Sequence, residues 1–331
     1  MVNRDELRLM ITGFRLSAAI MVAADLGLAD QLADGPRTVA DLAEAVSADA
    51  DTLNRLLRAL ATVGVYAEQP DGSYANTELG EGLRSDVPSS MRPLARTLTD
   101  PALWAAYGHL GHSVRTGENA FRAVNGVDVW THRLAKPEHN EIFNDNMTAL
   151  TSLVVDAVAS AYDFSGLSTL VDVGGGQGSL LEAILDRNPE LHGIVFDQAG
   201  VVAQAPTPGA SESVASRWST ASGSFFDEVP RADAHILKSI LHDWEDDECI
   251  EILRTCRKSL NDDGVVLVVE TVIGRLGHEV DAAFSDINML VMPGGRERSE
   301  EEFAALFEAA GLHLTNVVHT KSRMAVLEAK G

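Results

Sequence analysis

The sequence predicts an α/β protein in which an open, mostly parallel, doubly wound sheet follows a mainly helical, winged-helix region. Short apolar runs alternate with amphipathic stretches through residues 166–331, which is typical of parallel strands joined by crossover helices. Residues 1–100 lack that alternation and carry helix signals with a single hairpin signal. With 331 residues, 45 % of them hydrophobic, the chain can bury a sizeable core in one large or two medium domains.

The opening segment is interpreted as an amphipathic helix and not as a secretion signal. Residues 16–24 are apolar and small residues precede Asp25, as in a cleavable leader. However, Asp5 and Glu6 stand where a leader carries positive charge, and the helical pattern of apolar residues continues to Leu32. We therefore expect a folded first helix.

Two further helices and a hairpin complete the first hundred residues. Thr38 can cap a short helix, and Asp41 in its first turn favours the positive helix end. The next helix begins near Asp51 and ends at Gly64. Pro-Asp-Gly at residues 70–72 separates two short β-prone runs and predicts a turn between strands. Together these elements form a winged-helix pattern.

A winged helix raises two possibilities, a DNA-binding regulator or a dimerising domain. Residues 1–100 hold nine arginines, no lysine and fifteen acidic residues, a net charge of −6. The second helix offers only Arg55 and Arg58 for phosphate contacts, which disfavours DNA binding. The first helix carries more apolar surface than one core stripe needs, which favours a homodimer. Its apolar residues are Leu7, Met10, Ile11, Phe14, Leu16, Ile20 and Met21.

Residues 101–165 lack strand alternation and predict helices and connections. Trp104, Phe121 and Trp130 are conspicuous there, because only 5 % of the chain is aromatic. They either pack in a core or line an aromatic substrate pocket with Met147 as an adaptable wall. The residues alone leave both readings open.

The remainder of the chain supplies the strands and helices of the predicted sheet. The strand-like runs are 170–173, 193–196, 234–238 and 265–269, with helices that include 248–260 and 300–310. After the last helix, runs at 314–318 and 324–327 have no helix between them. This pair predicts an antiparallel hairpin at the sheet edge, which dinucleotide-binding folds do not usually have.

A glycine-rich loop joins the first of these strands to a helix. Gly174, Gly176 and Gly178 would let a ligand approach bare backbone there. The dinucleotide fingerprint requires glycine at position 179, which is Ser179 here. A dinucleotide needs helix amides aimed at its pyrophosphate, whereas an S-adenosyl ligand has no phosphate and passes close to the chain. The early third glycine favours an S-adenosyl ligand, although a tight structural turn would also need glycine.

Asp197 strengthens this interpretation. It ends the next predicted strand, 21 residues after Gly176, where a carboxylate can accept hydrogen bonds from both ribose hydroxyls. A lone aspartate at a strand end can be a turn residue, but its spacing from the glycine loop favours ribose binding.

Composition limits the partners and the compartment. A net charge of −23 repels nucleic acid and anionic lipid, so we expect neither nucleic acid nor membrane as a partner. Two cysteines suit a reducing compartment and no stretch is long enough to span a bilayer, which predicts a cytoplasmic protein. The acidic run at 245–248 is interpreted as a solvated helix start, and no metal is expected.

Three ordered blocks give a more specific signal. They are Leu-Lys-Ser-Ile-Leu-His-Asp-Trp-Glu-Asp at 237–246, Val-Val-Glu-Thr-Val-Ile-Gly at 268–274 and Met-Pro-Gly-Gly-Arg-Glu-Arg-Ser at 292–299. Together they resemble S-adenosylmethionine-dependent O-methyltransferases of the caffeate and hydroxyindole type. That family includes plant phenylpropanoid enzymes and bacterial polyketide and antibiotic tailoring enzymes.

The resemblance covers essentially the whole chain and implies a domain organisation. It implies a winged-helix dimerisation domain at 1–100, a helical connecting and substrate-pocket region at 101–165, and a class I, Rossmann-like methyltransferase domain at 166–331. It also implies S-adenosylmethionine as cofactor, a small-molecule acceptor and a homodimer.

The resemblance also implies roles for individual residues. His242 matches the general base, and Glu270 and Glu297 match the carboxylates that flank and orient it. The positions that match the cofactor site are Gly174, Gly176, Gly178, Asp197, Gly223, Ser224, Phe225 and Lys238. Ser224 stands where the family often has aspartate. The positions that match the substrate wall are Met147, Met289 and Met292.

These residues imply methyl transfer to a hydroxyl of an aromatic or polyketide-like small molecule. Because the cofactor brings the electrophile, the protein must position and deprotonate the acceptor. A phenol of pKa about 10 needs a base, and imidazole, with a pKa of about 6.5, can serve. The alternatives are a divergent member that methylates nitrogen or carbon, or one that uses the cofactor for other chemistry. An NAD-dependent oxidoreductase is disfavoured by Ser179 and by the terminal hairpin.

Overall fold

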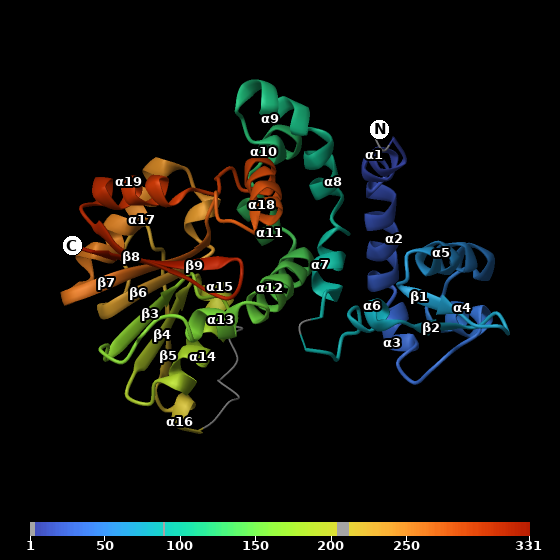
Figure 1. Ribbon diagram of the computed structural model, residues 1–331, viewed down its shortest axis with the longest axis horizontal. Helices are drawn as coiled ribbons and strands as arrows, with labels where there is room; N and C mark the ends of the chain where they lie inside the picture. The colour runs from blue at the N-terminus through green and yellow to red at the C-terminus, as the bar shows by residue number, and fades with distance from the viewer. Residues whose placement is uncertain (1–3, 89, 204–211) are drawn as a thin grey trace. The chain divides into compact units, whose positions relative to one another are not determined.

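The computed structural model describes residues 4–88, 90–203 and 212–331, which form two compact units (Figure 1). Unit 1 comprises Met1–Trp104 and Arg133–Leu150, and unit 2 comprises Ala105–His132 and Thr151–Gly331. The segment expected at 101–165 therefore contributes to both units.

Unit 1 is mainly helical and contains one small antiparallel sheet. The predicted hairpin is confirmed, because Tyr66–Glu68 pairs with Tyr74–Asn76. The elements that lie wholly in this unit are α1 (Arg4–Ile11), α2 (Phe14–Asp25), α3 (Leu28–Gln31), α4 (Val39–Ala45), α5 (Ala50–Thr62), β1 (Tyr66–Glu68), β2 (Tyr74–Asn76), α6 (Glu78–Glu81) and α7 (Arg92–Thr97). Three helices cross the unit boundary: α8 (Pro101–Gly108), α11 (Val129–Leu134) and α12 (Pro137–Ser152).

Local sequence explains the helix ends of unit 1. Thr38 accepts a hydrogen bond from the backbone N–H of Asp41 and so caps α4, as predicted. Asp49 caps α5 in the same way, and the helix begins at Ala50, one residue before the predicted start. The expectation of one continuous first helix is wrong, because the chain breaks after α1 and again at Gly27. Gly27 has a φ of 67°, which a right-handed helix cannot contain.

The helix pair α1 and α2 is apolar but short. Among the described residues, no single helix has both the length and the apolar character needed to cross a membrane. α1 and α2 taken together, bent by 46° at their junction, pass that test by length and composition only.

The first helix leaves its apolar side chains exposed. None of the residues of α1 is buried, and five large apolar side chains on α1 and at the start of α2 are more than half exposed. The exposed fractions are Leu7 51 %, Leu9 62 %, Met10 67 %, Ile11 68 % and Phe14 57 %. A contiguous apolar surface of this kind is characteristic of a protein–protein contact.

We expect the protein to be a homodimer joined through residues 1–100. Light scattering at micromolar concentration should report about twice the chain mass of 35.4 kDa. The double variant Met10→Glu and Phe14→Glu should shift the protein towards the monomer, because each carboxylate would be desolvated in the interface. The matched control is Leu276→Glu, at a side chain 87 % exposed in unit 2. A monomeric wild type would contradict the prediction.

Unit 2 is built on a seven-stranded sheet with the order β5-β4-β3-β6-β7-β9-β8. Its strands are β3 (Thr169–Val173), β4 (His192–Asp197), β5 (Trp218–Ser222), β6 (Ala232–Lys238), β7 (Leu260–Thr271), β8 (His313–His319) and β9 (Met324–Lys330). The first five are parallel, and β9 runs antiparallel between β7 and β8. The predicted terminal hairpin is thus confirmed, with β9 inserted inside the edge.

Helices cover both faces of this sheet (Figure 1). In β7, Val266 and Val268 face α17 (Asp246–Lys258) and α19 (Glu300–Ala310), whereas Val265, Leu267 and Val269 face α13 (Val155–Ala159) and α14 (Ser179–Arg187). The helices wholly in this unit are α9 (Leu110–Thr116), α10 (Ala120–Asn125), α13 (Val155–Ala159), α14 (Ser179–Arg187), α15 (Ala199–Val202), α16 (Glu212–Ala215), α17 (Asp246–Lys258), α18 (Glu279–Val291) and α19 (Glu300–Ala310), with a 3₁₀ turn, η1, at Leu241–Asp243. The carboxyl ends of β3, β4, β6 and β7 therefore meet at one edge, where a doubly wound sheet places its ligand.

Candidate active site

The glycine loop connects β3 to α14 with three left-handed residues. The φ angles of Gly174, Gly176 and Gly178 are 70°, 59° and 82°, which side chains disfavour. A Cβ at Gly178 would collide with the ring of Trp218, and one at Gly174 would collide with Ile240. At Gly176 the same position is open, so a ligand can lie against the backbone there.

Asp197 closes this loop from the end of β4. Its Oδ2 accepts a hydrogen bond of 2.9 Å from the N–H of Gly176, and its Oδ1 accepts one of 2.6 Å from Gln198. Each carboxylate oxygen keeps a second lone pair that two neighbouring hydroxyls could use. Burial raises the pKa of Asp197 above its ordinary value. The loop and the carboxylate together fit the ribose and methionine portions of an S-adenosyl ligand.

A buried acid that the sequence interpretation missed lies beneath the glycine loop. Asp172 is 2 % exposed, and its side chain occupies the space that a Cβ at Gly175 would need. Burial raises the pKa of Asp172 to about 7, although the positive charge of Lys238 opposes that shift. Lys238 ends β6, and its charge also interacts with Glu270. The signal was present in the sequence, since a charged residue inside an apolar strand is unusual.

The loop at residues 223–226 lies next to Asp197. The N–H of Gly223 donates to the carbonyl of Asp197 at 3.1 Å. The hydroxyl of Ser224 accepts a 3.2 Å hydrogen bond from the N–H of Phe226. Phe225 and Phe226 both pack edge-on against Trp244, with ring centroids 5.9 and 4.9 Å apart. The loop that holds three of the expected cofactor-site positions and the segment of His242 therefore share one aromatic cluster.

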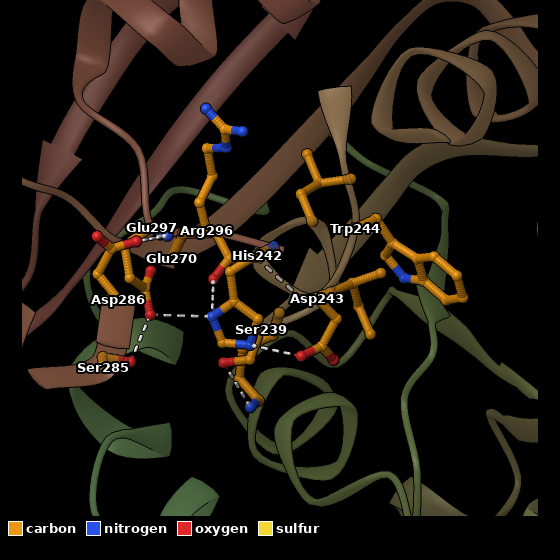
Figure 2. A network of polar contacts seen from close by, with 12 residues as sticks. Ser239, His242, Asp243, Trp244, Glu270, Ser285, Asp286, Arg296 and Glu297 are labelled. Atoms are coloured by element: carbon orange, nitrogen blue, oxygen red, sulfur yellow. Dashed lines mark hydrogen bonds and ion pairs between the residues drawn. The ribbon is translucent and has the colours of Figure 1, made fainter. Parts of the chain in front are cut away.

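His242 lies in η1, directly after β6, and contacts carboxylates on both ring nitrogens. Figure 2 shows Glu270 and Glu297 on one side of the imidazole and Asp243 on the other. Nδ1 lies 3.2 Å from Oε2 of Glu270 and 3.2 Å from Oε1 of Glu297, while Nε2 lies 3.7 Å from Oδ1 of Asp243. The structure thus brings together the three residues that the resemblance singled out, and among the described residues Nε2 has no short hydrogen bond.

The two glutamates are held by hydrogen bonds from different segments of the chain. Oε1 of Glu270 accepts hydrogen bonds from the N–H groups of Ile240 and His242, at 3.0 and 3.3 Å. Oε1 of Glu297 accepts a 2.5 Å hydrogen bond from Ser285, and its backbone N–H donates to Asp286 at 3.0 Å. Ser285 and Asp286 lie on α18 and were not found from the sequence, because their contact with position 297 is made only in the fold.

The electrostatics of the cluster favour a proton on the imidazole. Burial opposes a charged ring, but three neighbouring carboxylates outweigh it and raise the pKa of His242 to about 10. Burial raises the pKa of Glu270 to about 7. For Glu297, burial is outweighed by the hydrogen bond and charge of His242, and its pKa is lowered. Glu297 is therefore the carboxylate that stays ionised beside the imidazolium.

The residues expected to form a substrate wall fall in different units. Met289 and Met292 lie at the end of α18 in unit 2 and are 7 % and 4 % exposed. Met147 lies on α12 in unit 1 and is half-buried. Of the conspicuous aromatics, Phe121 is buried in unit 2, whereas Trp130 stacks on Trp244 at 6.4 Å.

The arrangement can move a proton and hold a nucleoside, and its donors also permit a metal. His242, Glu270 and Glu297 offer one nitrogen and two carboxylate oxygens within 4.8 Å of one another. A base with a raised pKa at the carboxyl edge of a doubly wound sheet, next to a glycine loop, is suited to deprotonating an acceptor beside a bound cofactor.

Comparison with known proteins gives two domain matches. The pattern of the O-methyltransferase domain matches residues 107–313, and that of the O-methyltransferase dimerisation domain matches residues 9–86. Phenazine O-methyltransferase PhzM from Lysobacter antibioticus is 40 % identical over 322 residues, covering 97 % of this chain and 94 % of that protein.

Two solved structures match this chain over nearly its full length. The crystal structure of LaPhzM matches with a TM-score of 0.95 and 39 % identity, covering 100 % of this chain and 99 % of that one. NcsB1 from neocarzinostatin biosynthesis, in complex with S-adenosylmethionine and 2-hydroxy-5-methyl naphthoic acid, matches with a TM-score of 0.83 and 35 % identity, covering 96 % of each chain.

Proposed function

The chain belongs to the O-methyltransferase family, and from that membership we propose that its acceptor is the hydroxyl of an aromatic or polyketide-like small molecule. As a family member it is an S-adenosylmethionine-dependent enzyme that methylates a hydroxyl. Relatives act on a phenazine and on a naphthoic acid, according to their names. The cluster of Phe225, Phe226, Trp130 and Trp244 beside His242 supports a flat aromatic acceptor.

We assign the cofactor to the edge formed by the glycine loop and Asp197. When bound, S-adenosylmethionine supplies a methyl group on a positively charged sulfur, which a nucleophilic oxygen can attack. Gly174, Gly176 and Gly178 leave the backbone bare, and the free lone pairs of Asp197 would receive the ribose hydroxyls. We place Gly223, Ser224, Phe225 and Lys238 in the same site.

His242 is the proposed general base. The observation that carries this mechanism is the placement of its two ring nitrogens. Nδ1 lies against Glu270 and Glu297, while Nε2 has no short hydrogen bond to any residue that the structure describes. A carboxylate on Nδ1 fixes the tautomer and stabilises the imidazolium that forms when Nε2 takes a proton. Met147, Met289 and Met292 are proposed as the adaptable walls that orient the acceptor.

The proton balance follows from the pKa of His242. Without an acceptor, a pKa of about 10 keeps the imidazole charged at neutral pH. The productive complex holds an imidazolium and an ionised acceptor oxygen, whichever group lost its proton first. Because a phenol has a pKa of about 10, the imidazole and the acceptor are closely matched, and sharing the proton costs little free energy.

The remaining assignments concern organisation and location. We propose that residues 1–100 serve dimerisation, 101–165 connect and line the pocket, and 166–331 carry catalysis. The acidic surface and the two buried, unpaired cysteines support a cytoplasmic location. We further propose that catalysis is independent of metal. The ring nitrogen of His242 and the carboxylate oxygens of Glu270 and Glu297, called the triad below, share a proton in place of a metal ion.

A screen of hydroxylated aromatic compounds tests the acceptor class. Incubation with labelled S-adenosylmethionine in the presence of EDTA should give products heavier by one methyl group, with the methyl on oxygen by mass analysis and NMR. The control omits the acceptor. Methylation found only on nitrogen or carbon, or lost on chelation, would contradict the proposal.

A further inference from the structure

Arg298 is a buried cation whose donors are almost all used within the protein. Its side chain is 1 % exposed. Its Nε and Nη2 both bond Oδ1 of Asp246, at 3.0 and 2.7 Å. Nη1 donates to the carbonyl of Leu241 at 3.0 Å, and Nη2 donates to the carbonyl of Trp244 at 2.9 Å. Nη1 also reaches the carbonyl of Arg296 at 3.3 Å.

The two distant carbonyls that Arg298 binds bracket the proposed base. Leu241 immediately precedes His242, and Trp244 follows it by two residues. Leu241 begins η1, a 3₁₀ turn of three residues, and Trp244 is the C-cap of that turn. The carbonyl of Leu241 accepts a 3.2 Å hydrogen bond from the N–H of Trp244, and Sγ of Cys249 donates to both carbonyls at 3.1 and 3.5 Å. The guanidinium adds its own hydrogen bonds to both carbonyls, which fixes the two ends of the turn to one side chain, and Asp246 ties that side chain to the start of α17.

The backbone of Arg298 is attached to the segments that carry Glu270 and Glu297, the two carboxylates of the triad. Arg298 directly follows Glu297 in the chain. It forms a parallel bridge with Val272, and its carbonyl accepts a 3.0 Å hydrogen bond from the N–H of Ile273, just beyond the end of β7, the strand that carries Glu270. One residue is thus attached to the segments that carry His242, Glu270 and Glu297.

A close approach of backbones makes this attachment possible. A Cβ at Gly295 would collide with the backbone of His242, Asp243 and Trp244. Only glycine lets the loop that precedes Glu297 lie directly on the turn that carries the base. The contact brings Arg298 within reach of both carbonyls.

We infer that Arg298 is a positioning residue that holds Nδ1 of His242 in register with Glu270 and Glu297. This inference rests on the proposed role of His242 as base. Arginine suits the position because its planar fork can serve one carboxylate and two carbonyls at once, which the point charge of lysine cannot do. Its removal frees the turn to rotate, so the imidazole loses one or both carboxylate partners.

The test compares Arg298→Met and Arg298→Lys with Arg296→Met. Arg296 lies two residues away, is about half exposed, and pairs with Glu245 only at the surface. Arg298→Met should lower kcat on the order of 10- to 100-fold, as removal of a partner that orients a reactive group does. The dissociation constant for S-adenosylmethionine should stay unchanged. Arg298→Lys should recover part of the loss, and Arg296→Met should behave as wild type.

Nitrogen-15 NMR of the His242 side chain separates positioning from fold stability. In wild type the ring should titrate far above an ordinary histidine, because both glutamates face Nδ1. In Arg298→Met its pKa should fall towards the ordinary value of about 6.5, and the pH profile of kcat should move with it. An unchanged His242 titration and unchanged kcat in the folded variant would overturn the inference.

Two further variants keep the test decisive if Arg298→Met does not fold. Asp246 is 57 % exposed, so Asp246→Asn should fold and shift the His242 titration in the same direction by a smaller amount. Gly295→Ala should shift it by displacing the turn. If neither variant moves the titration, the inference fails. The NMR signal reports the position of the ring whether or not His242 is the base, so this failure is distinct from failure of the proposed function, which only the turnover of His242→Gln would reveal.

Discussion

His242→Gln is expected to lower the acceptor-saturated turnover about 10²- to 10⁴-fold, the range typical for loss of a general base. Glutamine retains the size and a polar end but cannot take a proton at Nε2. Cofactor affinity should remain nearly intact, because the glycine loop and Asp197 hold the cofactor without using His242. Single-turnover kinetics at saturating acceptor, together with calorimetry of S-adenosylhomocysteine binding, measure the two effects separately.

Graded variants of the carboxylates sharpen this prediction. Glu270→Gln should reduce turnover less than His242→Gln, since Glu270 orients the imidazole and does not itself take the proton. Removing its charge should also lower the pKa of His242 below about 10, which moves the pH profile to lower pH. His313→Gln is the control, because the His313 side chain is exposed and pairs with Glu308, away from the carboxylates around His242. A full-rate His242→Gln enzyme would contradict the assignment.

The second large effect is expected for Asp197→Ala, which should weaken cofactor binding far more than folding. Loss of a charge-assisted hydrogen bond costs roughly 1.5–3 kcal/mol, or about ten- to a hundredfold in affinity. The carboxylate also fastens Gly176 at 2.9 Å, so its removal loosens the loop on which the cofactor lies. Calorimetric titration with S-adenosylhomocysteine gives the change in dissociation constant.

Asp233→Ala provides a matched control for Asp197→Ala. Asp233 also accepts hydrogen bonds from backbone N–H groups, those of Ser168 and Thr169 at 2.9 and 3.0 Å, but at the opposite end of the sheet. The Asp233→Ala variant should be less stable than wild type but should bind the cofactor with unchanged affinity. An unchanged dissociation constant in a well-folded Asp197→Ala protein would refute ribose binding by this residue.

The parts of the fold that follow from local pattern were predictable from the sequence. The spacing of 21 residues between Gly176 and Asp197 suggested a shared site, and the structure joins them by a direct hydrogen bond. Alternating apolar runs located six of the seven strands. The missed strand, β5, reads Trp-Ser-Thr-Ala-Ser, because an edge strand with mostly exposed side chains carries little apolar signal.

Contacts between distant segments could not be predicted. In sequence, Arg298 lies between Glu297 and Ser299 and looks like a surface charge, yet its side chain is buried because four oxygen acceptors converge on it. The acidic run at 245–248 was interpreted as a solvated helix start. Glu245 and Glu248 do cap α17, but Asp246 pairs with Arg298. Such pairings depend on tertiary packing, which has no local signature.

The measurement that tests the central claim most directly is the acceptor-saturated rate as a function of pH, for wild type and His242→Gln. In wild type the imidazolium lowers the pKa of the bound acceptor hydroxyl, so the rate should level off well below the acceptor's own pKa. In His242→Gln it should keep rising, about tenfold per pH unit, until that pKa is reached. The difference in rate between wild type and His242→Gln should therefore become smaller at high pH and with more acidic acceptors. If the two profiles overlay, positioning alone carries the catalysis and His242 is not the base.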